Sequence, residues 1–323
     1  MRAVIVEQTG GPQALTLVER EAPRPGAGEV LVDVTAGGVN FIDIYQRSGA
    51  YPLPLPFVAG SEGAGTVTEL GEGVEGLAAG DRVAWAMVPG TGYAEQVVVP
   101  AVKLVPVPEG VELETAAAAM LQGMTAHYLV NSTFEAQPGQ TALVTAAAGG
   151  VGLLLCQLLS EKGVRVIGTV GSAEKGELAK ANGADEVVLY REEDLVETVE
   201  RLTSQEGVHV VYDGVGKDTF DAGLSLLRPR GTMVLFGAAS GPVDPVDPQS
   251  LNAGGSLYLT RPSLAHYAAD REELLWRAGD VLGAVADGRL EVRVGGRYPL
   301  AGAQQAHEDL EGGRTTGKLL LLP

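Results

Sequence analysis

The fold of this chain of 323 residues can be inferred from one stretch of its sequence, Thr141-Ala142-Leu143-Val144-Thr145-Ala146-Ala147-Ala148-Gly149-Gly150-Val151-Gly152. It begins as a β-strand pattern, continues through small residues, and leads into the apolar helical pattern of residues 153–159. Glycines at such a turn let the backbone approach a pyrophosphate, and the N–H groups and dipole of the helix favour its negative charge. The stretch therefore predicts a nucleotide-binding βα turn formed by Ala148, Gly149, Gly150, Val151 and Gly152.

The segment after this turn alternates between helical and β-type patterns. Strands joined by helices form a parallel sheet with right-handed crossovers, so we expect a doubly wound α/β domain of the Rossmann type over residues 121–261. Two short helices joined through Gly123 should precede the first strand of this sheet, at residues 116–121 and 125–129. The alternating elements are helices at about 151–162, 174–182, 194–203 and 220–227 and strands at 165–170, 186–190, 208–213, 231–237 and 256–260.

The two ends of the chain have a different pattern from the middle. Residues 1–120 contain short β-type runs separated by glycine and proline, which is typical of a compact β-barrel or sandwich. Residues 262–323 contain one long helical pattern, at about 271–287, and a terminal apolar strand at 318–322. These few elements cannot bury a core alone, so we expect the tail to return to the N-terminal domain.

The charge and cysteine content exclude several classes of function. The formal net charge of -18 disfavours nucleic acid and anionic membranes as partners, because both would repel this surface. No apolar run reaches the length of a membrane span. The single cysteine, Cys156, lies in an apolar helical pattern and predicts a buried side chain rather than a disulfide framework. We therefore expect a cytoplasmic protein that binds a small molecule.

The loop after the second strand of the α/β domain bears on the identity of the nucleotide. NAD-binding sites commonly place a carboxylate about 20 residues beyond the glycines, where it holds the ribose 2'-hydroxyl. This chain has Val170 at that place, followed by Gly171-Ser172-Ala173-Glu174-Lys175. Such a loop suits a 2'-phosphate, which predicts NADPH (NADP) as the cofactor with Gly171, Ser172 and Lys175 as binding residues. The alternative is that Lys175, beside Glu174, is a solvated helix residue.

Several segments together resemble one known family. The run from Gly139 to Gly152, with Gln157 five positions on, is similar to the signature of the zinc-independent quinone oxidoreductases. These form the zeta-crystallin-like branch of the medium-chain dehydrogenase/reductase superfamily. The resemblance extends to residues 38–43, 123–126, 190–194 and 314–317 and so covers nearly the whole chain. It implies a GroES-like, β-rich catalytic domain built from both chain ends, and a homodimer or homotetramer.

The resemblance also implies roles for individual residues. Around the 2'-phosphate it places Lys175, Tyr190 and Arg314. Near the nicotinamide or its ribose it places Asn40, Tyr45, Thr125 and Tyr128, and beside the cofactor it places Phe236 and Gly237.

The zinc ligands of related dehydrogenases are replaced in this chain. Zinc-dependent members that it resembles have a cysteine near the place of Asn40 and a histidine at the place of Ser61. Zinc is normally held by Cys, His and carboxylate side chains, and Glu62 alone cannot hold it. The histidines are far apart in the sequence without paired ligand spacing, at positions 127, 209, 266 and 307. We therefore expect no metal.

A site without a metal favours an acceptor that is already electrophilic. The sequence thus predicts hydride transfer from NADPH to a quinone, with the protein orienting the cofactor. Asn40, Tyr45, Tyr51 and Thr125 are the candidate catalytic residues, as hydrogen-bond donors to a developing oxyanion. Packing beside prolines is an equally good interpretation of the two tyrosines, and Asp43 is better read as a structural hydrogen-bonding partner than as an acid.

Two alternatives remain at this point. The first keeps the fold and cofactor but reduces an activated double bond in an enone, enal or enoyl substrate. The second, of another class, is an NADPH-binding protein with a structural or RNA-binding role, which the net charge of -18 disfavours.

Overall fold

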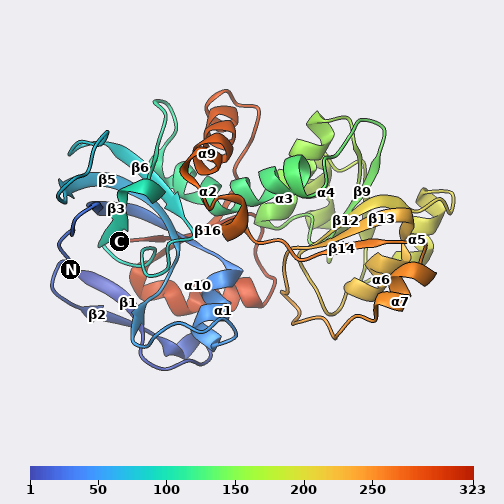
Figure 1. Cartoon of the computed structure of the whole chain (residues 1–323). Coiled ribbons are helices and arrows are strands. Elements are labelled where there is room, and N and C mark those ends of the chain that lie inside the picture. Colours follow the sequence, from blue (N-terminus) through green and yellow to red (C-terminus); the bar gives the residue numbers. More distant parts are fainter. The chain divides into compact units, whose positions relative to one another are not determined.

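The two ends of the chain build one unit of the structure, and the middle builds another. The structure is a computed structural model that describes all residues, Met1–Pro323. Unit 1 consists of Met1–Met124 and Ala268–Pro323, and unit 2 consists of Thr125–Tyr267 (Figure 1). The boundaries predicted from the sequence, after residues 120 and 261, lie a few residues before these.

Unit 1 contains two β-sheets. The larger has seven strands in the order β15-β16-β3-β5-β6-β8, with β7 also paired to β3, and the smaller has the order β2-β1-β4. Strand β16, the last of the chain, lies between β15 and β3 and pairs antiparallel with β3. The strands are β1 (Arg2–Val6), β2 (Leu15–Glu19), β3 (Glu29–Val39), β4 (Phe57–Val58), β5 (Glu62–Leu70), β6 (Arg82–Ala86), β7 (Gln96–Pro100), β8 (Val105–Pro106), β15 (Val294–Pro299) and β16 (Lys318–Leu322).

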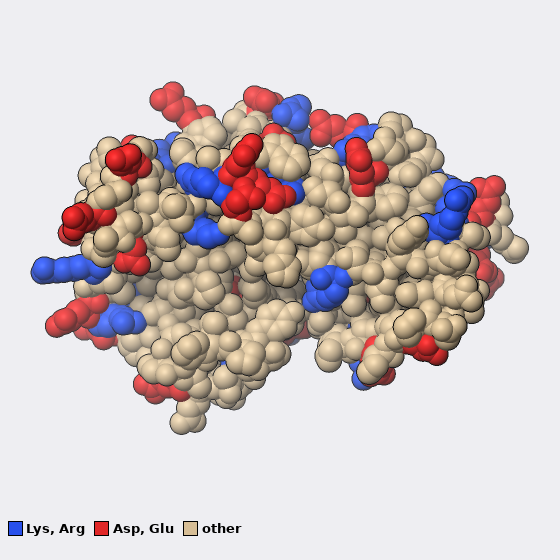
Figure 2. Space-filling model, in the orientation of Figure 1, with Lys and Arg blue, Asp and Glu red and all other residues tan.

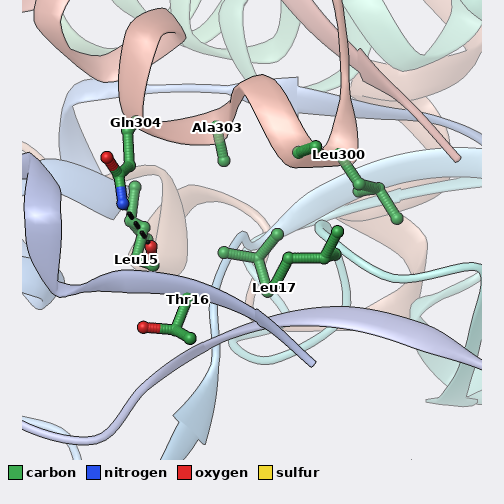
Figure 3. Close-up of a pocket in the computed structure, with 8 residues that line it drawn as sticks. Leu15, Thr16, Leu17, Leu300, Ala303 and Gln304 are labelled. Atoms are coloured by element: carbon green, nitrogen blue, oxygen red, sulfur yellow. Dashed lines mark hydrogen bonds between the residues drawn. The ribbon is translucent and has the colours of Figure 1, made fainter. Parts of the chain in front are cut away.

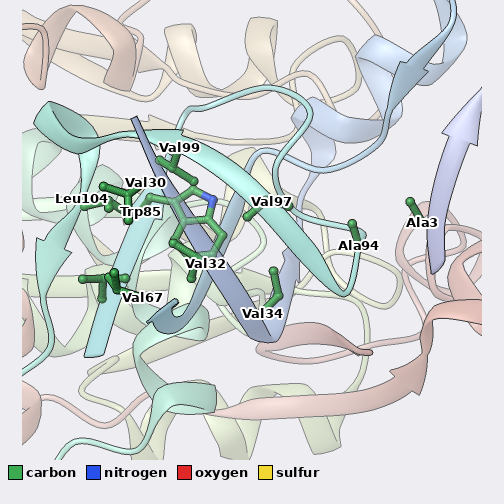
Figure 4. Close-up of a cluster of buried hydrophobic side chains, with 11 residues drawn as sticks. Ala3, Val30, Val32, Val34, Val67, Trp85, Ala94, Val97, Val99 and Leu104 are labelled. Atoms are coloured by element: carbon green, nitrogen blue, oxygen red, sulfur yellow. The ribbon is translucent and has the colours of Figure 1, made fainter. Parts of the chain in front are cut away.

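The core of the larger sheet follows from the alternation of side chains along its strands. In β3, Val30, Val32 and Val34 are buried at every second position and point to the same face. They pack with Trp85 of β6, which is fully buried (Figure 4). The helices of unit 1 are α1 (Phe41–Ser48), the first part of α2 (Leu113–Tyr128), α9 (Arg271–Ala286) and α10 (Ala303–Glu311), with short 3-10 turns η1 (Pro12–Ala14), η2 (Ala101–Lys103) and η4 (Leu300–Gly302).

Unit 2 is a parallel sheet with connecting helices, which confirms the predicted doubly wound α/β domain. Its six strands have the order β11-β10-β9-β12-β13-β14, and every paired neighbour is parallel. The strands are β9 (Thr141–Val144), β10 (Arg165–Val170), β11 (Glu186–Leu189), β12 (Val208–Asp213), β13 (Leu227–Leu235) and β14 (Tyr258–Thr260). The helices are the end of α2, the π-helical turn η3 (Leu129–Thr133), α3 (Gly150–Glu161), α4 (Ala173–Ala181), α5 (Leu195–Leu202), α6 (Phe220–Ser225), α7 (Pro248–Ala253) and α8 (Leu264–Tyr267).

Helix α2 corrects one prediction. The sequence predicts two helices joined through Gly123, but the structure has a single helix over Leu113–Tyr128. A Cβ atom added at Gly123 would lie 2.5 Å from a methyl carbon of Val281 in α9. Gly123 therefore permits close packing of two helices and does not break α2, and this contact depends on a residue far away in the sequence.

The charged side chains on the surface and the burial of Cys156 agree with what the composition predicts. On the face drawn in Figure 2, basic side chains lie scattered among acidic ones and form no basic patch. Cys156 is buried in α3, and burial raises the pKa of its thiol to about 12. None of the helices combines the length and the apolar character needed to cross a membrane.

Candidate cofactor site and active-site residues

The turn between β9 and α3 has the geometry of a phosphate-binding turn. Gly149 is the N-cap of α3, and the first turn of this helix contains no acidic residue. A Cβ atom added at Gly152 would lie 2.3 Å from the carbonyl oxygen of Ala146 and 2.8 Å from Cα of Ala147. Only glycine fits at this position. The N–H groups at the start of α3 thus fit the diphosphate of a dinucleotide, and Ala148, Gly150 and Val151 complete the turn.

The loop after β10 brings several predicted residues together. Ser172 caps α4 by accepting a hydrogen bond from the Lys175 backbone N–H at 3.4 Å. A Cβ atom added at Gly171 would lie 2.8 Å from the Tyr190 hydroxyl and 3.3 Å from Nε of Arg191. Residues 171 and 190 follow the carboxyl ends of the paired parallel strands β10 and β11. Gly171, Ser172, Lys175 and Tyr190 therefore lie in one neighbourhood.

Lys175, in the first turn of α4, and Arg191, which follows β11, lie near each other. Burial lowers the pKa of Lys175 below its usual value, and the nearby Arg191 guanidinium lowers it further. Two neighbouring cations suit a phosphate monoester, because charge-assisted hydrogen bonds to phosphate are strong. Arg191 is not among the residues predicted from the sequence, although its position directly after Tyr190 is a usable signal. Arg314 lies in unit 1, where its guanidinium pairs with Asp309 at 2.8 Å.

Asp213 organises the carboxyl ends of three further strands. Its Oδ1 atom accepts hydrogen bonds from the hydroxyls of Thr145 at 2.9 Å and Thr219 at 2.8 Å. Its backbone carbonyl accepts from the N–H groups of Phe236 at 2.8 Å and Gly237 at 3.2 Å. These bonds hold the ends of β9, β12 and β13 together, at the sheet edge where open α/β folds bind their ligands. They position Phe236 and Gly237 at that edge.

The predicted residues of α2 lie in the part of the helix that belongs to unit 2. Thr125 is buried near the C-terminal end of the helix. The ring of Tyr128 stacks on that of Tyr267, with centroids 4.4 Å apart and planes 4° from parallel. This stacking fixes the orientation of the Tyr128 ring.

In unit 1, three of the predicted catalytic residues lie in or next to helix α1. Asn40 is its N-cap, and the Asn40 backbone N–H donates to Oδ2 of Asp43 at 2.9 Å. The rings of Tyr45 and Tyr51 have centroids 5.2 Å apart, and the Tyr51 N–H donates to the Tyr45 carbonyl at 2.9 Å. Tyr51 is 46% exposed, whereas Asn40 is buried. The structure thus brings Tyr45 of the helix that Asn40 begins into contact with Tyr51, which follows this helix.

The Asn40 carboxamide is held by a buried ion pair that the sequence analysis did not identify. Lys318 in β16 donates to Oδ1 of Asn40 at 2.6 Å and forms a salt bridge with Glu62 at the start of β5. Nδ2 of Asn40 donates to Oε2 of Glu62 at 2.8 Å and to the Gly38 carbonyl at 3.3 Å. All three side chains of this Asn40–Glu62–Lys318 cluster are buried. Lys318 and Glu62 are separated by 256 positions, so no local pattern could reveal the pair.

A second buried chain of hydrogen bonds reaches Asp43. The Tyr93 hydroxyl lies 3.1 Å from Oδ2 of Asp43 and 2.9 Å from Nε2 of His307. Nδ1 of His307 lies 3.0 Å from a guanidinium nitrogen of Arg47, which can only donate, so Nδ1 accepts and Nε2 carries the proton. Burial lowers the pKa of His307 to about 3, helped by Arg47. Burial raises the pKa of Asp43 to about 7.

The side chains at the places of the zinc ligands contact other protein groups. No group of three or more His, Cys, Asp or Glu side chains is placed to hold a metal ion. Ser61 donates to the Gln46 side chain at 3.3 Å, and the Glu62 carboxylate is shared between Lys318 and Asn40. An ammonium group therefore neutralises the carboxylate in this cluster.

A cavity elsewhere in unit 1 contains none of the predicted residues. It measures about 260 Å³ and lies between β2 and the segment from η4 to α10 (Figure 3). Gln304 at its wall donates to the Leu15 carbonyl at 2.9 Å. The cavity is lined by Val4, Leu15, Thr16, Leu17, Leu300, Ala301, Ala303 and Gln304. None of these side chains is charged, and none is an acid or a base.

Comparison with protein families identifies both units. Residues 26–109 match the alcohol dehydrogenase GroES-like domain, and residues 150–268 match the zinc-binding dehydrogenase family. The first match confirms the predicted GroES-like domain in unit 1. The second family is named for zinc, whereas this chain has Asn40 and Ser61 at the places of the predicted cysteine and histidine ligands.

Three similar proteins span nearly the whole chain. A quinone oxidoreductase of Pseudomonas aeruginosa is 46% identical over 97% of both chains. A 2-haloacrylate reductase of a Burkholderia species is 39% identical over 99% of this chain and 98% of that protein. A mycobacterial protein whose structure was solved in complex with NADPH is 52% identical over the full length of both chains, with a TM-score of 0.97.

Proposed function

The chain belongs to the quinone oxidoreductases of the medium-chain dehydrogenase/reductase superfamily, and from this premise we propose that it reduces quinones with NADPH. The observation that carries the choice of cofactor is the cluster of Lys175, Tyr190 and Arg191 beside Gly171. An NAD-dependent site would have a carboxylate after the second strand, and a carboxylate would repel the 2'-phosphate. Here that place holds Val170, and Lys175 and Arg191 lie near each other beyond the ends of β10 and β11.

The residues of unit 2 hold and orient the cofactor in this proposal. The N–H groups at the start of α3 bind the diphosphate, and Lys175, Tyr190 and Arg191 bind the 2'-phosphate. We include Arg314 as a further phosphate ligand because the family resemblance implies it; in unit 1 its guanidinium pairs with Asp309. Phe236 and Gly237, held by Asp213, border the cofactor together with Thr125 and Tyr128. When bound, NADPH supplies the hydride.

The acceptor in this proposal needs no metal ion. A quinone carbonyl conjugated to two double bonds accepts a hydride more readily than a simple ketone, so hydrogen-bond donors suffice to stabilise the charge on its oxygen. Tyr45, Tyr51 and Thr125 supply hydroxyl donors. The Asn40–Glu62–Lys318 cluster holds an ammonium group in contact with the carboxylate and the carboxamide. We therefore infer a zinc-independent enzyme.

Steady-state kinetics with both cofactors tests the proposal. The purified enzyme should oxidise NADPH in the presence of 1,4-benzoquinone or a 1,2-naphthoquinone, and kcat/KM for NADPH should exceed that for NADH by at least tenfold. Activity should survive dialysis against a chelator, because the inferred mechanism uses no metal. Equal use of both cofactors would reject the NADPH assignment. Absence of quinone turnover would reject the substrate class.

A second candidate function is the reduction of an activated carbon–carbon double bond. It is supported by the 39% identity to a 2-haloacrylate reductase over nearly the full chain. Both reactions deliver a hydride to a conjugated acceptor, so the same cofactor geometry serves both. Enones, enals and haloacrylates should be assayed beside quinones at equal NADPH concentration. A higher kcat/KM on the alkenes would make the enzyme a double-bond reductase.

The remaining parts of the proposal concern partners and location. We infer a cytoplasmic homodimer or homotetramer, for which sedimentation equilibrium gives the subunit number. We expect no nucleic-acid partner, because a net charge of -18 repels phosphate backbones. The alternative of an RNA-binding role predicts tight binding of a labelled RNA near physiological salt, and fluorescence anisotropy measures it.

A further inference from the structure

The Asn40 carboxamide has a single orientation, because its neighbours differ in hydrogen-bonding character. Lys318 can only donate, and it faces Oδ1 at 2.6 Å. Ionised Glu62 can only accept, and it faces Nδ2 at 2.8 Å. A flipped carboxamide would place its NH₂ group against the ammonium and its oxygen against the carboxylate, and both contacts would be repulsive. The cluster thus selects one of the two orientations.

This orientation uses both amide hydrogens of Asn40. One is directed to Glu62 and the other to the Gly38 carbonyl at 3.3 Å. The carbonyl oxygen Oδ1 accepts one bond from Lys318, and an amide oxygen has two lone pairs. The remaining hydrogen-bonding capacity of this side chain is therefore one acceptor site. Asn40 is predicted from the sequence as a donor to an oxyanion, whereas in the structure its amide hydrogens bond to Glu62 and to the Gly38 carbonyl.

Stability alone gives no reason for a buried ion pair here. Lys318 and Glu62 are both fully buried, and the desolvation of two buried charges offsets much of their attraction. Replacement of such a pair by apolar residues of similar volume is often neutral or stabilising. The pair also needs a glycine at position 38, because a Cβ atom added at Gly38 would overlap the Glu62 carboxylate.

The Glu62 carboxylate also reaches helix α2. Its Oε1 atom accepts the backbone N–H of Leu121 at 2.5 Å, whereas Oε2 serves Asn40 and Lys318. A single side chain thus joins the N-cap of α1, the last strand β16 and the helix that carries Thr125 and Tyr128. A change at Glu62 will affect the elements on which the predicted catalytic residues lie.

We propose that Lys318 and Glu62 are positioning residues that fix Asn40 as a hydrogen-bond acceptor for a hydroxyl or amide N–H group of the bound cofactor or substrate. The identity of that ligand rests on the proposed function. Asn40 then orients the ligand, and stabilisation of the oxyanion is left to the hydroxyls of Tyr45, Tyr51 and Thr125.

A set of three variants separates positioning from folding. Lys318→Met and Glu62→Gln each remove one charge and keep the approximate volume, and the single Lys318→Met change leaves a buried carboxylate unpaired. The double variant Lys318→Met/Glu62→Gln removes both charges, so its melting temperature should return toward that of the wild type. Lys180→Met is the matched control, because it breaks an exposed pair with Glu177 on the surface.

The expected result is a loss of activity that the double variant does not recover. In the single and double variants, kcat/KM with a quinone should fall about tenfold to a hundredfold. This factor corresponds to the loss of one hydrogen bond that involves a charged group. Lys180→Met should keep wild-type activity. Recovery of activity together with stability in the double variant would overturn the proposal, since a purely structural pair would behave in this way.

A spectroscopic measurement on the wild type is independent of activity and of how the variants fold. The chain has four asparagines, Asn40, Asn131, Asn182 and Asn252, so selective ¹⁵N-asparagine labelling gives few side-chain signals. Both Nδ2 hydrogens of Asn40 should exchange with D₂O much more slowly than those of exposed Asn252. Equally fast exchange would show that the carboxamide is not held. This test stands even when no quinone is reduced.

Discussion

At the scale of single residues, the environment of each side chain decides its chemistry more than its identity does. Asp43 and His307 are both buried and are linked through the Tyr93 hydroxyl, yet burial shifts their pKa values in opposite directions. Asp43 titrates at about 7 and His307 at about 3. The folded protein therefore favours the neutral form of both groups.

The linked pair predicts how stability depends on pH. The raised pKa of Asp43 means that the folded chain binds more protons than the unfolded chain between pH about 4 and 7, so this contribution falls as pH rises. The depressed pKa of His307 means that the unfolded chain binds more protons between pH about 3 and 6.5, so that contribution rises with pH. In the shared window, from about 4 to 6.5, the two slopes oppose each other.

The substitution Asp43→Asn should reveal the contribution of His307 to the pH dependence of the free energy of unfolding. The variant keeps an acceptor for the Tyr93 hydroxyl but no longer titrates. Its free energy of unfolding should rise with pH by about 1.4 kcal/mol per unit more steeply than that of the wild type between pH 4.5 and 6. Urea denaturation at three pH values measures this. Parallel curves for the two proteins would contradict the assigned pKa values.

The substitution Lys175→Glu should lower kcat/KM for NADPH without a similar effect on NADH. A carboxylate beside Arg191 and Tyr190 would repel a 2'-phosphate, so kcat/KM for NADPH should fall about tenfold to a hundredfold. The value for NADH, which has no 2'-phosphate, should change little. Lys180→Glu on the same helix, with a half-exposed side chain, is the control for a charge change alone. Equal losses with both cofactors would show that Lys175 does not contact the phosphate.

At the scale of elements, what could be predicted depended on whether the signal was local. The turn from β9 to α3 was predicted because its glycines, strand and helix are contiguous. Helix α1 was missed, although an Asn-x-x-Asp capping pattern at Asn40 and Asp43 marks its start. Helix α10 and strand β15 were also missed. The continuity of α2 was not predictable, because it depends on the contact of Gly123 with Val281.

The same turn gives an element-scale prediction. Gly152→Ala forces its new methyl group against the Ala146 carbonyl, 2.3 Å away, so it should cost about 1–3 kcal/mol of stability and weaken NADPH binding. Gly279→Ala is the matched control, since Gly279 is exposed on α9 and its Cβ would meet nothing within 4 Å. That change should stabilise by about 0.5–1 kcal/mol. Thermal unfolding and NADPH titration compare the two, and a stable, cofactor-binding Gly152→Ala variant would contradict the close packing.

At the scale of the whole molecule, the fold class followed from the sequence, but the active-site cluster did not. Period-two patterns and βα alternation are repeated many times along the chain, so errors at single elements do not change the class. The Asn40–Glu62–Lys318 cluster is formed by single residues from three distant segments. Only the three-dimensional pairing of β16 with β3 brings the third of them into place.

The position of β16 predicts a severe effect of truncation. Ending the chain after Gly317 removes a strand that has neighbours on both sides in the larger sheet, together with Lys318. We expect an insoluble or partly unfolded protein with no cooperative melting of unit 1 by circular dichroism. Removal of Pro323 alone, which follows the strand and is exposed, should leave the melting temperature unchanged. A soluble truncated chain with wild-type melting would show that β16 is dispensable.

The interleaving of the two units also sets the order in which the protein can mature on the ribosome. All residues of unit 2 have been synthesised by Tyr267, so it can begin to fold while the tail is still being made. The large sheet of unit 1 stays open at β3 until the last strand emerges. Lys318, the counter-ion of Glu62, is synthesised 256 positions after it. A chain released too early therefore carries an unneutralised carboxylate and an open sheet edge, which marks it for recognition by chaperones and proteases.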